Sequence, residues 1–324
     1  MVTCPLCKEP ALSRSVKVRS GKDMVLWHCN HCHFDFFAHD PTASLAANNL
    51  DESRLKASGL EIPSRDADFI NGLKQSRPHI VEYITPEDSE ENILEVGCSW
   101  GYFLKLVRDS GAVPYGVEVN PIRAKYVNDD LNIPCYPDIE SCESSGIRFH
   151  KIFLFYVLEY IPQPVAYLKR LINLLMDGGS LVIITPNLND AIKDLYFNEG
   201  FIHFFYDEHA INYFSFQSVE QIAKSLNKSN SLIETRQGYS FINHINWFLT
   251  KSPRTTNVVG GDTFVNEFTA PLRLRDPQYV SEWTPDHHLM AGELVNLIDE
   301  FDHNYRYILE RYNYGNQIRI VIRK

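Results

Sequence analysis

The stretch Ile93-Leu-Glu-Val-Gly-Cys-Ser-Trp-Gly-Tyr-Phe-Leu104 decides the fold. Its apolar strand runs into a tight turn containing Gly97 and Gly101, and a helix begins immediately afterwards. In such a turn the backbone N–H groups of the helix N-terminus face a crevice where an anionic group binds. A dinucleotide fingerprint requires G-x-G-x-x-G, whereas Ser99 occupies the middle position here. The turn therefore suits the carboxylate of an amino-acid moiety better than a pyrophosphate.

Strand and helix patterns alternate around this stretch, which predicts a doubly wound parallel sheet. The expected strands are residues 92–98, 115–119, 135–136, 151–157, 180–185, 231–235 and 317–322. The predicted fold class is therefore α/β, with a Rossmann-like seven-stranded sheet. Helices are also expected between 67 and 84, interrupted near Pro78, and from about 290 to 309.

The chain divides into three parts by composition. Residues 1–40 hold two Cys-x-x-Cys pairs and little helical periodicity, residues 41–86 form a linker with a helical segment, and residues 87–324 carry the alternating pattern. An insertion at about 241–315 separates the last two expected strands. A length of 324 residues suffices for one large α/β domain with such additions.

Two further segments complete a known pattern. Glu118 ends the second strand, where an acid can accept hydrogen bonds from both hydroxyls of a ribose. The fourth strand leads into Phe155-Tyr-Val-Leu-Glu-Tyr-Ile-Pro-Gln-Pro164. With the Glu-x-Gly-x-x-x-Gly of the first turn, these segments resemble the class I S-adenosylmethionine-dependent methyltransferases. Tyr160 stands where that family usually has His.

The resemblance implies that S-adenosylmethionine binds at the carboxyl ends of the first four strands. Glu95 would contact the methionine amino group or cap the turn, and Asp138 would hold the adenine amino group or cap a helix. The cofactor-binding residues implied are Glu95, Gly97, Cys98, Ser99, Gly101, Tyr102, Phe103, Glu118, Val119, Asp138, Phe155, Tyr156 and Leu158.

The N-terminal part predicts a metal site. Cys4, Cys7, Cys29 and Cys32 have the spacing C-x2-C-x21-C-x2-C, which is typical of a tetrahedral zinc ribbon. Four protein ligands leave no open coordination position, so the predicted zinc is structural. The basic stretch containing Arg14 and Arg19 is interpreted as a solvated loop.

The segment that follows the fifth strand is the predicted acceptor side. Tyr206-Asp-Glu-His-Ala-Ile-Asn-Tyr-Phe-Ser215 resembles the Y-H-E-H-x-x-Y-F-S stretch of methyltransferases acting on nucleotide-linked sugars and surface polysaccharides. Asp207 replaces the first His of that stretch, and one extra residue precedes Tyr213. The predicted catalytic residues are His209, Tyr206 and Glu208, because a His beside a carboxylate is a sensible general base.

These observations favour an enzyme that methylates a sugar, either nucleotide-linked or part of a surface-glycan precursor, on O or N rather than C. One alternative is a zinc-ribbon rRNA base methyltransferase, and another is a non-catalytic S-adenosylmethionine-binding protein. The net charge of -10 argues against a nucleic-acid partner. No apolar run reaches the roughly 20 residues of a membrane span, and a cytoplasmic location is expected. The oligomeric state stays open.

Overall fold

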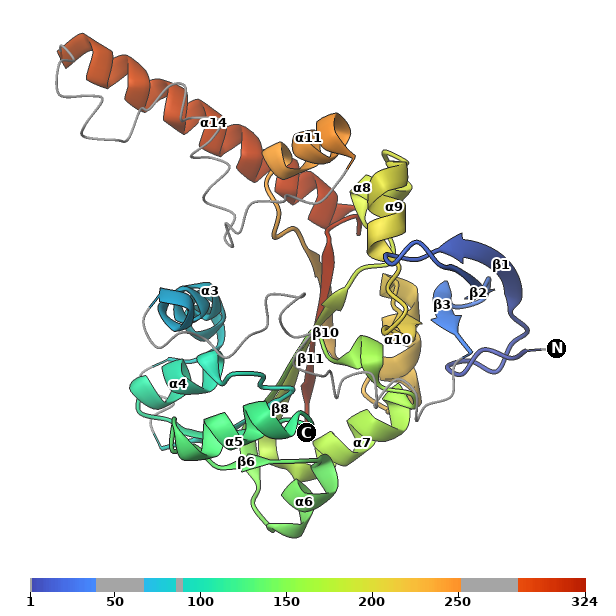
Figure 1. Ribbon diagram of the computed structural model, residues 1–324, viewed down its shortest axis with the longest axis vertical. Coiled ribbons are helices and arrows are strands. Elements are labelled where there is room, and N and C mark those ends of the chain that lie inside the picture. Colours follow the sequence, from blue (N-terminus) through green and yellow to red (C-terminus); the bar gives the residue numbers. More distant parts are fainter. Residues whose placement is uncertain (1, 39–66, 86–89, 252–284) are drawn as a thin grey trace.

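The computed structural model describes residues 2–38, 67–85, 90–251 and 285–324, and its centre is a seven-stranded sheet (Figure 1). The strand order is β10-β11-β8-β7-β4-β5-β6. β11 runs antiparallel to both of its neighbours, and the other pairs are parallel. The predicted Rossmann-like class I methyltransferase sheet is thereby confirmed. Its strands are β4 (Asn92–Val96), β5 (Val113–Val117), β6 (Cys135–Tyr136), β7 (Phe149–Phe155), β8 (Leu175–Pro186), β10 (Leu232–Arg236) and β11 (Gln317–Arg323).

Helices cover the sheet because its central strands are apolar on both faces. Ile152, Phe153 and Leu154 of β7 are completely buried, which only packing from both sides can achieve. The connecting helices are α4 (Tyr102–Asp109), α5 (Pro121–Asp129), α6 (Ile139–Ser144), α7 (Pro164–Leu174) and α10 (Phe216–Ser225), with the short η2 (Leu158–Tyr160) after β7. This arrangement leaves the carboxyl ends of the parallel strands at one edge of the domain.

The N-terminal part forms a small sheet that also includes one strand from a much later part of the chain. β1 (Leu12–Lys17), β2 (Asp23–Cys29) and β3 (Phe34–Phe37) are antiparallel, and β3 also pairs with β9 (Asn212–Tyr213). β9 belongs to the segment predicted as the acceptor side. The ribbon is therefore joined by a shared sheet to the segment that follows β8.

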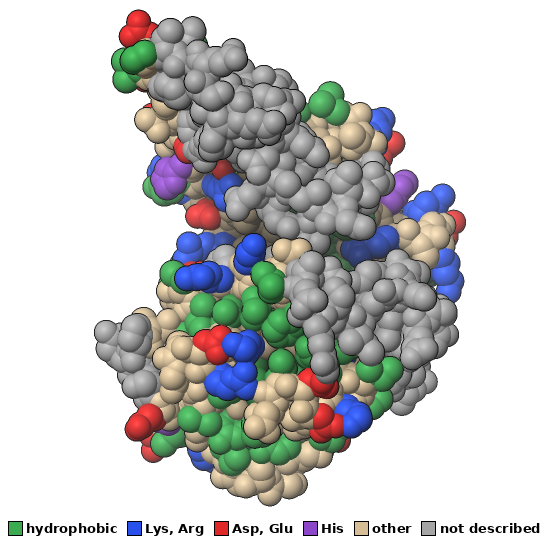
Figure 2. All heavy atoms as spheres, turned by 60° about the vertical axis from the view of Figure 1, so that its left-hand side comes forward, with side chains coloured by type: hydrophobic (Ala, Val, Ile, Leu, Met, Phe, Trp, Pro, Cys, Tyr) green, Lys and Arg blue, Asp and Glu red, His purple; other side chains and the backbone are tan. Residues whose placement is uncertain are grey.

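Two short helices lie between β8 and β9, and the described part of the predicted insertion contains one short and one long helix. α8 (Ala191–Asp194) and α9 (Glu199–Phe205) follow β8, whereas α11 (Phe241–Thr250) and α14 (Pro285–Arg311) separate β10 from β11. α14 projects from the body of the molecule, and Figure 2 shows hydrophobic side chains at the far end of this arm. Within the part that the structure describes, no helix is long and apolar enough to cross a membrane.

The structure corrects two expected boundaries. The helix α3 (Ala67–Tyr83) continues through Pro78, so the predicted interruption there is wrong. Proline removes one N–H donor, and here the helical backbone continues on both sides of it. β8 begins at Leu175, five residues before the expected start, and therefore includes the Gly178-Gly179 pair. The predicted linker between 41 and 66 lies outside the described residues.

Candidate functional site

The turn after β4 has a backbone conformation that requires glycine at two positions. Gly97 and Gly101 have φ of 76° and 74°, and Ser99 between them has φ of 49°. A Cβ atom at Gly97 would lie 2.4 Å from Cγ2 of Val157, and one at Gly101 would lie 2.8 Å from Cδ1 of Leu131. The two glycines are thus required both by left-handed backbone and by close packing.

Glu118 holds this turn from the neighbouring strand. Its Oε2 accepts a hydrogen bond from the amide of Ser99 at 2.9 Å, and its Oε1 accepts one from the amide of Asn120 at 2.8 Å. The side chain is buried at the carboxyl end of β5. Glu118 therefore joins the two loops between which the sequence predicts the adenosyl group.

Glu95 supplies an independent test of whether a cationic group fits here. Its Oε2 atom is buried and has no hydrogen-bond partner among the residues that the structure describes. Burial, and next the charge of Glu118, raises the pKa of Glu95 well above its usual value. A buried carboxyl without a partner is costly unless a donor reaches it. The amino group of a methionine moiety would supply that donor, so the residues fit S-adenosylmethionine.

Three predicted cofactor residues turn their side chains away from the turn. The Sγ of Cys98 lies 3.7 Å from that of Cys135 in the core. The ring centroid of Tyr102 lies 5.0 Å from that of Phe69 on α3, and Phe103 is buried against the aromatic side chains of β7. These residues offer their backbone to the turn. Gly101, the N-cap of α4, provides no capping side chain, which leaves the first helical amides available to an anionic group.

Asp138 and Val119 lie at the ends of β6 and β5. Asp138 is the N-cap of α6, and its Oδ1 accepts the amide of Ser141 at 2.7 Å. The hydrogen bonds from Ser141 lower the pKa of Asp138. Helix capping is therefore one role of Asp138, and its contact with adenine stays a prediction. Val119 is exposed beside the loop that Glu118 holds.

Phe155, Tyr156 and Leu158 take three different places after β7. The ring of Phe155 packs edge-on against Phe103 with centroids 5.2 Å apart, and Leu158 is completely buried. Tyr156 has φ of 56° and points into a cavity, where its hydroxyl donates to Oε1 of Gln317 at 2.5 Å. Of these three, only Tyr156 lines the cavity described next.

This acceptor cavity has a volume of about 300 Å³ and lies beside the carboxyl ends of β7 and β8. It adjoins the cofactor turn, because Val157 contacts Gly97 and the preceding Tyr156 lines the cavity. Its walls are mainly aromatic, with three acids and one arginine. The lining residues are Arg19, Tyr156, Glu159, Tyr160, Pro186, Asp190, Phe201, Phe204, Phe205, Asp207, Ala210, Asn212, Tyr213, Tyr239 and Asn316.

Two acids of the acceptor cavity are almost completely buried. Burial raises the pKa of Asp190 to about 7, against the opposing effects of the Ile192 amide and the Lys193 charge. Burial also raises the pKa of Glu159 to about 8, although its own amide and the hydroxyl of Thr185 lower it. Carboxyl groups that titrate near neutral pH are suited to proton transfer.

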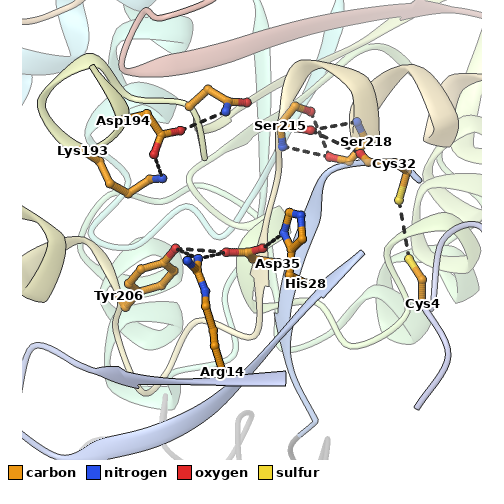
Figure 3. Close-up of polar contacts among 11 residues, drawn as sticks. Cys4, Arg14, His28, Cys32, Asp35, Lys193, Asp194, Tyr206, Ser215 and Ser218 are labelled. Carbon is orange, nitrogen blue, oxygen red and sulfur yellow. Dashed lines mark hydrogen bonds and ion pairs between the residues drawn. The ribbon is translucent and has the colours of Figure 1, made fainter. Parts of the chain in front are cut away.

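The predicted catalytic segment is held mainly by the ribbon. The hydroxyl of Tyr206 donates to Oδ2 of Asp35 at 3.0 Å and accepts from Nη2 of Arg14 at 2.8 Å. Figure 3 shows both side chains meeting at Asp35, with His28 on its other oxygen. Burial, and then the charge of Asp35, raises the pKa of Tyr206 well above its usual value. Its proton is therefore retained at neutral pH.

Glu208 and His209 lie on the turn that precedes β9. Burial raises the pKa of Glu208, but hydrogen bonds from its own amide and from Ser20 outweigh this effect and lower the pKa. The ionised form of Glu208 is thereby stabilised. The amide of His209 donates to Oδ1 of Asp207 at 2.9 Å. His209 is not among the residues that line the acceptor cavity. Its predicted role as the base stays a prediction.

The four cysteines of the ribbon come together as predicted. The Sγ atoms of Cys4 and Cys32 are 3.6 Å apart, those of Cys7 and Cys29 are 3.4 Å apart, and all four lie within 4.8 Å of one another. Tetrahedral zinc with Zn–S bonds of about 2.3 Å places its sulfur ligands about 3.8 Å apart. The donor set and its closed geometry fit a structural ion of this kind.

Sequence reasoning missed most residues of the acceptor cavity as site residues, among them Asp190, Glu159 and Arg19. Asp190 and Glu159 each follow the carboxyl end of a parallel strand, which is a position where acids are informative. The sequence favours a solvated loop for the basic stretch that contains Arg19, and Arg19 is an exposed residue of the turn between β1 and β2. Its side chain contacts Phe204 and Asp207.

Comparison with known proteins agrees with the fold. Residues 71–229 match the family described as methyltransferase domain. The ubiquinone biosynthesis O-methyltransferase of Coxiella burnetii is 28% identical over 106 residues, which is 31% of this chain and 45% of that protein. The chain thus matches less than half the length of this curated relative. With the sheet order, these findings define the fold: the chain has the Rossmann-like class I fold, and residues 71–229 of it are similar to a methyltransferase domain.

Two solved structures illustrate the likeness. A SAM-dependent methyltransferase from Archaeoglobus fulgidus is 15% identical with a TM-score of 0.46, covering 78% of this chain and 94% of that one. The plantazolicin methyltransferase, solved in complex with S-adenosylhomocysteine, is also 15% identical with a TM-score of 0.47, covering 88% and 95%.

Proposed function

We propose that this protein transfers a methyl group from S-adenosylmethionine to a hydroxyl or amino group of a sugar bound in the acceptor cavity. One observation carries the proposal: the cavity adjoins the turn held by Glu118, through the contact between Val157 and Gly97. A methyl donor bound at the turn and a methyl acceptor bound in the cavity would meet at that contact. Cofactors of this class supply an electrophilic methyl group on a sulfonium.

The lining of the acceptor cavity supports a sugar. Aromatic faces such as Tyr160 and Tyr239 offer apolar surface to the C–H groups of a ring, while Asp190 and Asn212 offer polar groups to its hydroxyls. Mixed linings of this kind, in which a few polar groups orient a ligand between apolar walls, are typical of small-molecule sites. The volume of about 300 Å³ accommodates one or two sugar rings.

Asp190 is the base that the geometry favours. It lines the acceptor cavity at the start of α8, where its Oδ1 accepts the amide of Ile192 at 2.7 Å and is held in place. Asp190 would accept the proton of the attacking hydroxyl or ammonium group. The acceptor atom would then form its bond to the methyl carbon of a bound cofactor as the carbon–sulfur bond breaks, and the electron pair of that bond would remain on the thioether. The position of His209 outside the lining makes it the weaker candidate.

The rate should depend on pH through this base. Asp190 must be ionised to accept a proton, and burial raises its pKa to about 7. We expect kcat/KM to fall tenfold per unit as the pH drops below about 7 and to level off above it. The charged groups near Asp190 include Lys193 and Asp194, which form an ion pair with each other. A profile that stays level from pH 8 to 5 would contradict a carboxylate base with this pKa.

A second candidate acceptor is a phenolic hydroxyl. The Coxiella burnetii relative is named as an O-methyltransferase of ubiquinone biosynthesis, and the aromatic walls of the acceptor cavity would stack on a phenol ring. Parallel assays with sugar nucleotides, free sugars, catechols and rRNA fragments separate the possibilities. Turnover of sugars supports the main proposal, and turnover of catechols alone replaces it. Activity on rRNA that falls steeply with salt would support the nucleic-acid alternative.

Cofactor binding is tested separately. Glu118→Ala removes both hydrogen bonds that hold the turn, and we expect the Kd for S-adenosylhomocysteine to rise about 10- to 100-fold in calorimetry. Asp129→Ala, an exposed acid on α5, is the control and should leave this Kd unchanged. Equal Kd values for the two variants would contradict the proposed cofactor site.

We also propose that the four ribbon cysteines hold one structural zinc ion. Cys4, Cys29 and Cys32 are buried, so such an ion would be screened from solvent and from the acceptor cavity. The ribbon residues near that cavity then act through the fold of the ribbon and not through the metal itself.

A further inference from the structure

The hairpin turn of the ribbon reaches the acceptor cavity through Arg19. The guanidinium carbon of Arg19 lies 4.1 Å from the ring centroid of Phe204, and Nε donates to the backbone carbonyl of that residue at 2.9 Å. Nη1 is 3.1 Å from Oδ2 of Asp207. All three residues line the acceptor cavity. The guanidinium is thus fixed in orientation by a ring, a carbonyl and a carboxylate.

The backbone of the turn is fixed as well. The amide of Arg19 donates to the carbonyl of Tyr206 at 2.8 Å, and Ser20 is hydrogen-bonded to Glu208. Val18 is buried in an apolar cluster that it shares with Tyr206 and Tyr213. Contacts on both sides of Arg19 therefore place the turn against the cavity segment.

Arg19 has N–H groups that the described residues leave unused. A guanidinium carries five N–H groups, and the described residues take one from Nε and one from Nη1. The remaining N–H groups can donate to oxygen atoms of a bound molecule. A planar fork of donors can donate to two neighbouring oxygen atoms of one ligand.

The charges of the acceptor cavity indicate which kind of oxygen atom Arg19 would bind. Its lining contains three acids, Glu159, Asp190 and Asp207, and one cation, Arg19. Asp207 already balances the charge of Arg19. Among the described residues, a phosphate or sulfate in the cavity would meet Glu159 and Asp190 with no second lining cation, whereas neutral hydroxyl groups would pair with both donor and acceptor groups.

We infer that the ribbon hairpin forms one wall of the acceptor site and that Arg19 binds adjacent hydroxyl groups of an uncharged sugar ring. The inference rests on the proposed function and narrows it. If the acceptor is nucleotide-linked, its diphosphate lies outside this cavity. The N-terminal ribbon is then part of the substrate site and not a separate binding module.

The test uses the full chain with its metal. Arg19→Ala removes the guanidinium group. We expect the acceptor KM to rise about 10- to 100-fold, because hydrogen bonds from a charged donor are lost. The Kd for S-adenosylhomocysteine should stay within twofold. Arg19→Lys keeps the charge without the planar fork and should recover only part of the acceptor affinity. Lys22→Ala, at the other end of the same turn, is the control and should match the wild type.

Each outcome has a distinct meaning. If the wild type methylates no sugar, the proposed function fails before Arg19 is tested. If the wild type methylates a sugar and both Arg19 variants keep its KM within twofold, the inference about Arg19 is wrong. Saturation-transfer NMR of the sugar with S-adenosylhomocysteine present gives a readout independent of turnover, and far-UV circular dichroism reports whether Arg19→Ala has folded. Where it has not, Arg19→Lys decides through its KM.

Discussion

Asp190→Asn is expected to lower kcat by about 10²- to 10⁴-fold, the range measured when a general base is removed. Asparagine has nearly the same shape and can still accept the amide of Ile192 through its side-chain oxygen, so the start of α8 should be retained. It cannot accept a proton from the acceptor. The Kd for S-adenosylhomocysteine should therefore stay within twofold, because the turn at Gly97 lies on the other side of Val157.

Two matched variants make this result interpretable. Asp194→Asn removes a neighbouring acid that does not line the acceptor cavity, and it should keep kcat within threefold of the wild type. His209→Asn tests the base predicted from the sequence. A kcat reduced by 10²-fold or more in His209→Asn, with Asp190→Asn nearly unaffected, would assign the base to His209 and reject the role of Asp190. Single-turnover rates with S-adenosylmethionine in excess separate the chemical step from product release.

The conformation of the turn proposed to hold the cofactor was predictable because its determinants are local. One strand, one turn and one helix within twelve residues place Gly97 and Gly101, and the next strand end places Glu118. The required backbone conformations leave few alternatives at these positions. The side-chain directions of Cys98, Tyr102 and Phe103 were not predictable, because residue spacing alone does not show that α3 and β5 pack where these side chains point.

The acceptor half depends on contacts between distant segments. Tyr206 was predicted as catalytic because it stands beside an acid and a histidine in the sequence. Its hydroxyl instead meets Asp35 and Arg14, which lie more than 170 residues earlier in the chain. Within the described residues, the strand that brings the two segments together is β9, which has two residues and no recognisable pattern of its own. A pairing this short is fixed by the packing around it and not by the sequence of either strand.

The ribbon shows the same division between local and distant determinants. The spacing of the cysteines predicts their cluster, since each pair of ligands sits on one short turn. The place of the ribbon against the catalytic domain depends on buried charges such as Asp35. Burial raises the pKa of Asp35, but the hydrogen bond from His28 and the charge of Arg14 hold it below its usual value. Such a buried, paired acid fixes which surfaces meet, because removing a partner would leave it uncompensated.

Removal of the metal is expected to affect the two halves of the site unequally. Cys4→Ser takes away one ligand of a closed four-sulfur site, whereas a chelator takes away the ion, and either change removes the link between the two Cys-x-x-Cys turns. Amide exchange in β1, β2 and β3 should then speed up by about 100-fold or more, while β4 and β7 remain protected. Atomic emission should find about one zinc ion per wild-type chain and less in Cys4→Ser.

The consequence for function follows from Arg19 and Tyr206. When the ribbon loosens, the hairpin no longer holds its wall of the acceptor cavity, and we expect acceptor kcat/KM to fall by about 10²-fold. The Kd for S-adenosylhomocysteine should change by less than threefold, because neither Glu118 nor Gly97 contacts the ribbon. Cys142→Ala, a buried thiol in α6, controls for the loss of a cysteine as such. A metal-free protein with normal acceptor kinetics would separate the ribbon from the acceptor site, whereas an equal loss of cofactor affinity would mean that the ribbon stabilises the whole domain.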